Sequence, residues 1–307
     1  MRSRYEIMTM NDKTTRRAAA SRPRNVSRNA SAGANANIGS QTGRPTGRPS
    51  NGKRSAKRRR RPNPLLLLLT AAVTLFALWK LGGEVLDKTQ SRALVEEMRA
   101  QAVQTPTTEP TEIAPDMEFA PITVDFEQMW QSYPDLVAWL YCPGTSLNYP
   151  VVQTDNNQFY VSHLPNGQES ASGALFVDCT NSYGFADANT LIYGHDMKDG
   201  SMFGNLHNYS MPDYYSRHKD IYLLTPGQNY RMEILTAAVV SDDSWVYEMK
   251  MDEARRKTWA LDAHRLSLVG TQATADLEAE HYLTLSTCSY EYENARFVLI
   301  GSLKEIY

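Results

Sequence analysis

Two residues near the C-terminus, Cys288 and Arg296, have the types and the spacing of a thiol nucleophile and its cationic partner. Cys288 closes the apolar and β-branched run 282–288, and Arg296 opens the next such run eight positions later, after an acidic loop. If the two runs form a hairpin, the two side chains lie next to each other at the rim of a sheet. A guanidinium beside a thiol favours the thiolate and can donate hydrogen bonds to an oxyanion. The alternative is that Cys288 is a buried apolar filler and Arg296 a surface charge.

His195 is the third candidate because it also follows a strand-like run. Residues 190–193 are apolar or β-branched, Gly194 permits a sharp turn, and the loop 196–204 that follows is predicted to be flexible. An imidazole gains and loses a proton near neutral pH, which the leaving amine of an acyl transfer requires. Three other histidines lie in polar segments that we expect to be exposed: His207, His218 and His264.

The remaining cysteine and histidine pattern argues against other kinds of site. The sequence has no HExxH motif and no Cys/His cluster with metal-ligand spacing, so a zinc enzyme is not expected. Three cysteines are too few for a disulfide scaffold. His195 precedes Cys288 by 93 residues, whereas papain-like enzymes place the cysteine first. We interpret Cys142 and Cys179 as structural, with a disulfide between them as a lesser alternative.

The elements that must position these residues belong to a chain with a divided charge. The 307 residues have a net charge of −2, but residues 1–62 hold 17 Lys/Arg and two acids, while 63–307 hold 15 Lys/Arg and 32 acids. Residues 1–62 are rich in Arg, Ser, Asn, Gly and Pro and contain almost no large apolar residue after Met10, which predicts disorder. A basic tail alone would suggest nucleic-acid binding. The segment that follows makes this a minor alternative, and no nucleic-acid partner is expected.

Fifteen uncharged residues, 65–79, follow the basic block 57–61 and predict a membrane anchor. The stretch is shorter than the roughly 20 residues that span a bilayer, but Lys80 can snorkel to the interface and Trp79 suits the headgroup level. The alternatives are a buried core helix and a cleaved signal peptide, for which the long preamble is unsuited. The basic block predicts a cytoplasmic N-terminus and an extracytoplasmic remainder.

The sequence predicts four parts: a disordered basic tail 1–62, a transmembrane anchor 63–83, a helical stalk and Pro-rich linker 84–121, and a globular domain 122–307. Strand-like runs dominate that domain: 147–152, 173–177, 190–193, 221–224, 230–240, 282–286 and 297–303. Helical patterns occur at 126–133, 156–160 and 251–269. Many short strands with few helices indicate a mainly β domain, a closed barrel or sandwich with helices outside it.

Several segments, taken in order, resemble the sortase family and most of all its class B: WLYCPGTSLNYPVVQTDNNQFY (139–160), GALFVD (173–178), NTLIYGHDM (189–197), MFGNL (202–206), YLTLSTC (282–288) and ARF (295–297). The LSTC element with an upstream YGH and a downstream Arg is specific only as a set. The resemblance covers nearly all of 122–307. It implies an eight-stranded sortase-type β-barrel with peripheral helices, one of them at 251–269 between the sixth and seventh strands.

The resemblance also implies an activity and a site. The chain would be a membrane-anchored cysteine transpeptidase that cleaves a C-terminal sorting signal of secreted proteins after a Thr. It would pass the acyl group to an amine of a cell wall peptide precursor or, alternatively, to a pilin lysine. Cys288 would be the nucleophile, His195 the proton donor and acceptor, and Arg296 the group that positions the substrate and holds the oxyanion.

The same resemblance sets the surroundings of the enzyme. It implies a single-pass protein of the cell membrane of a Gram-positive type envelope, with lipid contacted through the anchor and the catalytic domain on the extracellular face. We expect no cofactor and no metal, since calcium is a class A feature. A different class of function remains open, a membrane-tethered binding module in which Cys288 is inert.

Overall fold

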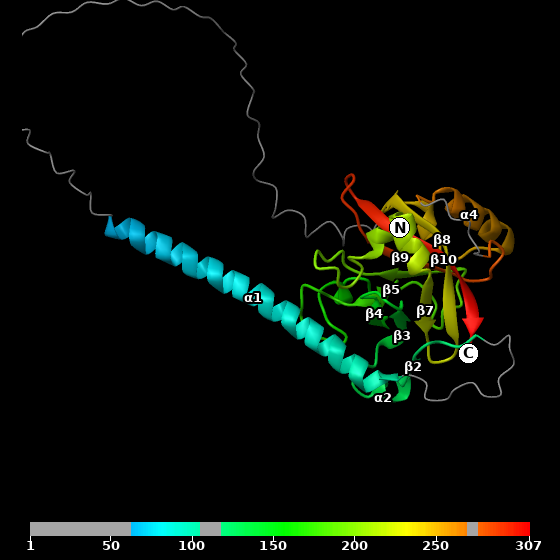
Figure 1. Ribbon diagram of the computed structural model, residues 1–307, viewed down its shortest axis with the longest axis horizontal. Coiled ribbons are helices and arrows are strands. Elements are labelled where there is room, and N and C mark those ends of the chain that lie inside the picture. The colour runs from blue at the N-terminus through cyan, green and yellow to red at the C-terminus, as the bar shows by residue number, and fades with distance from the viewer. Residues whose placement is uncertain (1–62, 105–117, 269–275) are drawn as a thin grey trace, which may run out of the picture. The chain divides into compact units, whose positions relative to one another are not determined.

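The computed structural model describes residues 63–104, 118–268 and 276–307. Its main feature is a barrel of eight strands: β3 (Leu136–Tyr141), β4 (Asn148–Val152), β5 (Leu175–Val177), β6 (Asn189–Tyr193), β7 (Asp220–Leu224), β8 (Asn229–Ser241), β9 (Tyr282–Cys288) and β10 (Ala295–Ile306). The barrel closes in the order β10-β8-β7-β3-β4-β5-β6-β9 (Figure 1). The pairs β4–β5 and β6–β9 are parallel, and the other neighbours are antiparallel. The prediction of an eight-stranded β-barrel is confirmed.

The helices lie outside this barrel: α1 (Pro64–Ala102), α2 (Phe126–Trp130), α3 (Pro212–Arg217) and α4 (Glu253–Arg265), with the 3-10 turns η1 (Phe159–Val161), η2 (Leu206–Ser210) and η3 (Trp245–Tyr247). The helix α4 connects β8 and β9, the sixth and seventh barrel strands, as expected. It begins after Asp252, whose side chain accepts the backbone N–H of Arg255 at 2.8 Å and so caps the first turn. Trp259 of α4 is fully buried in a cluster with residues of β8 and β10. Figure 1 shows α4 beside these strands.

Two local predictions differ from the structure. The pattern at 156–160 forms no α-helix, because the side chain of Asn156 accepts the N–H groups of Gln158 and Phe159 and turns the chain into the short η1. No strand was predicted at β3, because its apolar residues do not alternate with polar ones. The strand is packed on both faces, with Trp139 and Leu140 both fully buried. The predicted tail, residues 1–62, lies outside the described residues.

The stalk expected at 84–104 is part of one continuous helix, α1, of 39 residues. Contacts divide the chain into two units with the boundary between Leu78 and Trp79, so the second half of α1 belongs to the barrel unit. Met98 and Ala102 are fully buried in a cluster with Phe126 and other residues of α2 and β3. Directly after α1, β1 (Val103–Gln104) pairs with β2 (Thr123–Val124). The four-part division stays a prediction, but the folded unit uses residues well before 122.

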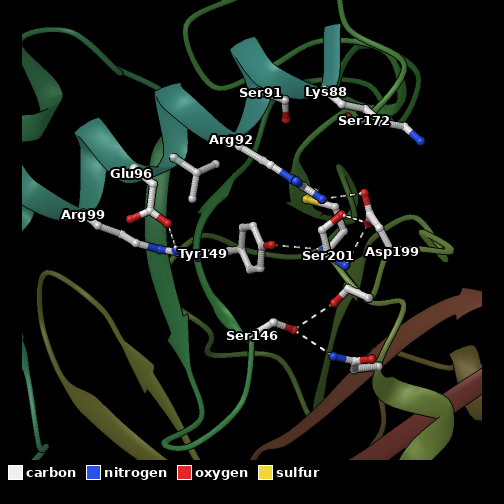
Figure 2. Close-up of a pocket in the computed structure, with 14 residues that line it drawn as sticks. Lys88, Ser91, Arg92, Glu96, Arg99, Ser146, Tyr149, Ser172, Asp199 and Ser201 are labelled. Carbon is white, nitrogen blue, oxygen red and sulfur yellow. Dashed lines mark hydrogen bonds and ion pairs between the residues drawn. The ribbon is translucent and has the colours of Figure 1, made fainter. Parts of the chain in front are cut away.

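Polar contacts also tie α1 to loops of the barrel. Arg92 forms an ion pair with Asp199 at 2.9 Å, and the backbone N–H of Ala171 donates to Asp87 at 3.1 Å. A cavity of about 430 Å³ lies between this part of α1 and the loop that contains Asp199. Figure 2 shows the guanidinium of Arg92 reaching across the cavity to Asp199, and Tyr149 below it. Neither His195, Cys288 nor Arg296 lines this cavity.

This packing leads to a prediction about fragments. A fragment of residues 122–307 should unfold more easily than one of residues 84–307, because it loses the side chains of Met98 and Ala102 from the core. Fully burying one large apolar side chain contributes about 1.5–3 kcal/mol, so we expect a loss on the order of 3 kcal/mol in the free energy of unfolding. Urea unfolding followed by circular dichroism measures it, and equal midpoints for the two fragments would contradict the role of α1.

Candidate active site

Cys288 and Arg296 are direct partners in the register of the barrel. Cys288 is the last residue of β9, Arg296 the second residue of β10, and the antiparallel ladder pairs them with each other. Beyond them the backbone N–H of Ser289 donates to the carbonyl of Ala295 at 3.0 Å and closes the hairpin. Side chains of directly opposed residues point to the same face of a sheet, with Cβ atoms about 5 Å apart. The predicted hairpin geometry is therefore confirmed.

Arg296 is not a surface charge. Its side chain is 7% exposed, Nη1 donates to the carbonyl of Ala295 at 2.9 Å, and Nη2 lies 3.5 Å from a carboxylate oxygen of Asp242. Burial raises the pKa of Asp242, and the nearby guanidinium lowers it only in part. A guanidinium has five N–H donors. Within the described part of the chain these contacts engage two of them, which leaves donors that can face an oxyanion.

His195 is placed beside the end of β9 by the parallel pairing of β6. Tyr193 pairs with Ser286, the N–H of Gly194 donates to the carbonyl of Ser286 at 3.2 Å, and the hydroxyl of Thr287 donates to the carbonyl of Gly194 at 2.8 Å. His195 follows Gly194, two residues after the end of β6, and Cys288 follows Thr287 as the last residue of β9. The histidine and the cysteine therefore lie at the same end of the barrel, at the ends of two neighbouring strands.

The ring of His195 has one nitrogen engaged by the backbone. Nε2 lies 2.7 Å from the carbonyl oxygen of Val161. Because a carbonyl oxygen only accepts, this nitrogen carries a hydrogen. Nδ1 is then the nitrogen that can exchange a proton with a substrate, and the contact with Val161 holds the ring in one orientation.

The loop after His195 is closed by backbone contacts, and its predicted flexibility stays a prediction. The N–H of Phe203 donates to the carbonyl of His195 at 3.0 Å, and Asp196 and Met202 form an antiparallel bridge. Gly194 is needed for close packing and not for a turn. A Cβ there would lie 2.4 Å from Cδ2 of Leu175 and 2.7 Å from the ring of Phe203.

The other two cysteines follow other strands of the barrel, Cys142 after β3 and Cys179 two residues after β5. Cys142 is fully buried, its Sγ lies 3.4 Å from the hydroxyl of Tyr209, and burial raises its pKa, which disfavours the thiolate. The backbone N–H of Cys179 donates to Asn157 at 2.7 Å. All three cysteines are described, and no disulfide joins any two of them. These contacts fit the structural interpretation of Cys142 and Cys179.

Two residues of the site were missed by sequence reasoning. The hydroxyl of Tyr247, in η3, lies 2.9 Å from that of Ser286, and burial raises the pKa of Tyr247. Nε2 of His207, in η2, lies 3.1 Å from the carbonyl oxygen of Cys288.

The expectation that three histidines are exposed is wrong, since all three are half-buried: His207, His218 and His264. The sequence signal that could have indicated the burial of His207 is the pair of apolar residues near it, Leu206 and Tyr209, which are buried and pack η2 against the barrel.

The sequence and the fold of this chain are similar to those of known proteins. The model of the sortase domain matches residues 140–304, more than half of the chain. The chain belongs to the sortase family. The sortase B of Listeria monocytogenes is 29% identical over 78% of this chain and 95% of its own length. The sortase B of Staphylococcus aureus is 26% identical over 59% of this chain and 75% of its own. A solved Staphylococcus aureus sortase B–substrate complex shares the fold, with a TM-score of 0.62 at 23% identity, covering 72% of this chain and 100% of that one.

The chain is thus a class B sortase, a cysteine transpeptidase, as the motif set predicted. Among the described residues no group of three or more His, Cys, Asp or Glu side chains is placed to hold a metal ion. The expected absence of metal and cofactor stays a prediction.

Proposed function

We propose that Cys288, His195 and Arg296 are the catalytic residues of this sortase. The observation that carries the proposal is the end of the barrel itself, where Cys288 is the direct cross-strand partner of Arg296 and His195 extends from the parallel neighbour of β9. The three residues supply the three needs of acyl transfer to a thiol: a nucleophile, a proton carrier and a fixed positive charge. Among the described residues, the buried thiol of Cys142 instead contacts the hydroxyl of Tyr209 and the backbone carbonyl of His218.

The reaction follows from these roles. The thiolate of Cys288 attacks the carbonyl carbon of the scissile peptide bond, and the oxygen of that carbonyl becomes an oxyanion beside the guanidinium of Arg296. The C–N bond breaks as His195 gives its proton to the leaving amine, and a thioester on Cys288 remains. An incoming amine then attacks the thioester, His195 takes up the proton that this amine loses, and the thiolate of Cys288 leaves.

We propose that the substrates are secreted proteins with a C-terminal sorting signal and that the acceptor is an amine of a cell wall peptide precursor. A pilin lysine is the second candidate acceptor. Both acceptors are amines, and the proposed mechanism treats them alike up to the thioester. The choice between them therefore depends on the second step alone, which an assay can isolate.

We propose further that α1 anchors the enzyme in the cell membrane. Its apolar window has a mean hydropathy of 2.0 and no buried residue, and its leucines Leu65–Leu69 are all exposed. Water-facing leucines in such a run are unfavourable, whereas lipid would accommodate them. The ammonium of Lys80 lies 6.0 Å from the ring of Trp79, a pair suited to the headgroup region. The basic block 57–61 favours a cytoplasmic N-terminus and an extracellular catalytic domain.

The proposal is tested with the purified fragment of residues 84–307 and a set of peptides that carry sorting signals. We expect one peptide to be cleaved with a mass adduct on Cys288, and the adduct to be released by an added amine. Triglycine and a lysine-bearing peptide, compared at equal concentration, separate a wall-type from a pilin-type acceptor. If no peptide forms an adduct and iodoacetamide labels Cys288 no faster than Cys142, the inert binding module is the better description.

A further inference from the structure

His207 connects three elements of the candidate site. It lies in η2, and its Nε2 is 3.1 Å from the backbone carbonyl oxygen of Cys288 and 3.6 Å from a carboxylate oxygen of Asp196. Its ring also packs on that of Phe297, with centroids 4.7 Å apart. One imidazole therefore touches the end of β9, the residue that follows His195, and β10.

The contacts settle which hydrogen the ring presents. The carbonyl oxygen of Cys288 can only accept, so Nε2 carries a hydrogen that it donates to this oxygen, with the carboxylate of Asp196 3.6 Å away. The nearby carboxylate of Asp196 raises the pKa of His207, against the effect of burial, and the carboxylate of Glu291 raises it further. A donor at this position is therefore maintained in both charge states of the ring.

The connection matters because the barrel ladder stops just short of the reacting groups. The strand β6 ends at Tyr193, two residues before His195, and β9 ends at Cys288 itself. The last backbone link between these strands is the hydrogen bond from Gly194 to Ser286. The hydroxyl of Thr287 adds a side-chain link to the carbonyl of Gly194. A contact from His207 to the backbone of Cys288 itself would act one residue nearer the reacting groups, where a displacement of about 1 Å can cost on the order of 100-fold in rate.

We propose that His207 is a positioning residue for the transpeptidation: its Nε2–H holds the carbonyl of Cys288 while the ring faces the carboxylate of Asp196, and so it fixes Cys288 against the segment that carries His195. The proposal rests on the proposed catalytic roles of Cys288 and His195. His207 acts through the backbone of Cys288 and through Asp196, and it does not contact the substrate.

Two substitutions separate the hydrogen bond from the packing of the ring. His207→Gln keeps an N–H donor and loses the ring, while His207→Phe keeps a ring against Phe297 and loses the donor. We expect His207→Phe to lower kcat for peptide cleavage about 10- to 100-fold with KM within about 3-fold, since geometry at the reacting atoms is lost. We expect His207→Gln to stay within about 5-fold of the wild type. The matched control is the same pair of changes at His264, a half-buried histidine of α4, which should leave kcat unchanged.

A second readout keeps this test independent of the sorting substrate. The rate at which iodoacetamide labels Cys288 at pH 7, mapped by mass spectrometry, should fall several-fold in His207→Phe and not in His207→Gln, because a misplaced thiol loses contact with its cationic partner. If no peptide is cleaved even by the wild type, the proposed function fails while the labelling rates still decide on His207. Equal rates in the two variants, whether both low or both normal, would overturn the proposal, because the N–H donor would then make no difference. A fall in His207→Gln alone would overturn it too, because the packing of the ring would then be what matters.

Discussion

Replacing Cys288 by alanine is expected to abolish both peptide cleavage and amine transfer. The substitution removes the nucleophile, and the remaining guanidinium and imidazole cannot form a thioester. Loss of a covalent nucleophile in comparable acyl-transfer enzymes lowers kcat by on the order of 10⁴-fold or more. The measurement is the rate of cleavage of a sorting peptide by the purified protein, together with the disappearance of the mass adduct.

The matched controls are the other two cysteines. Cys142→Ala and Cys179→Ala should cleave within a few-fold of the wild-type rate, because neither thiol lies at the end of β9. Cys142→Ala is also expected to lower the melting temperature, since it removes a fully buried Sγ that contacts Tyr209. Substantial activity in Cys288→Ala, measured in a preparation free of wild-type enzyme, would show that the nucleophile has been assigned wrongly.

The sequence carried the information for the strands that hold the site. The runs that became β6, β9 and β10 are apolar or β-branched and are bounded by turn residues, so they could be recognised locally. The spacing between Cys288 and Arg296 then predicts a hairpin partner, and the register agrees. The motifs that resemble sortases predicted a closed barrel, whereas the local strand patterns alone were compatible with either a barrel or a sandwich.

What the sequence did not reveal depends on contacts between distant residues. His207 meets Cys288 across 81 positions and Asp87 meets Ala171 across 84, and no periodicity near either residue signals such a partner. The burial of Met98 likewise requires the surface that α2 and β3 form later in the chain. The bridge between Asp196 and Met202 in the loop after His195 was not predicted for the same reason, because the polar composition of this loop shows no sign of it.

The second large effect is expected at His195. His195→Ala should lose nearly all turnover, and His195→Gln should do no better, because an amide can replace the hydrogen bond to Val161 but cannot carry a proton to the leaving amine. The wild-type rate should follow a bell-shaped pH profile, since a thiolate and a protonated imidazole are required together. A His195→Gln variant with wild-type turnover would remove His195 from the mechanism.

Arg296→Lys tests the third role, and we expect it to lower kcat about 100- to 1000-fold, the usual loss when an oxyanion donor is removed. A lysine keeps the charge but not the planar fork, so it cannot hold the carbonyl of Ala295, face Asp242 and still present N–H groups to an oxyanion. Because Arg296 is buried beside Asp242, its replacement also disturbs this ion pair and can destabilise the fold. The melting temperatures of the variant and the wild type must therefore be compared before their rates. The control is Arg231→Lys, which changes a partly buried arginine with carboxylate partners on β8, near the end of that strand opposite the site. If Arg296→Lys is folded and turns over at the wild-type rate, the planar guanidinium is dispensable and the catalytic set reduces to His195 and Cys288.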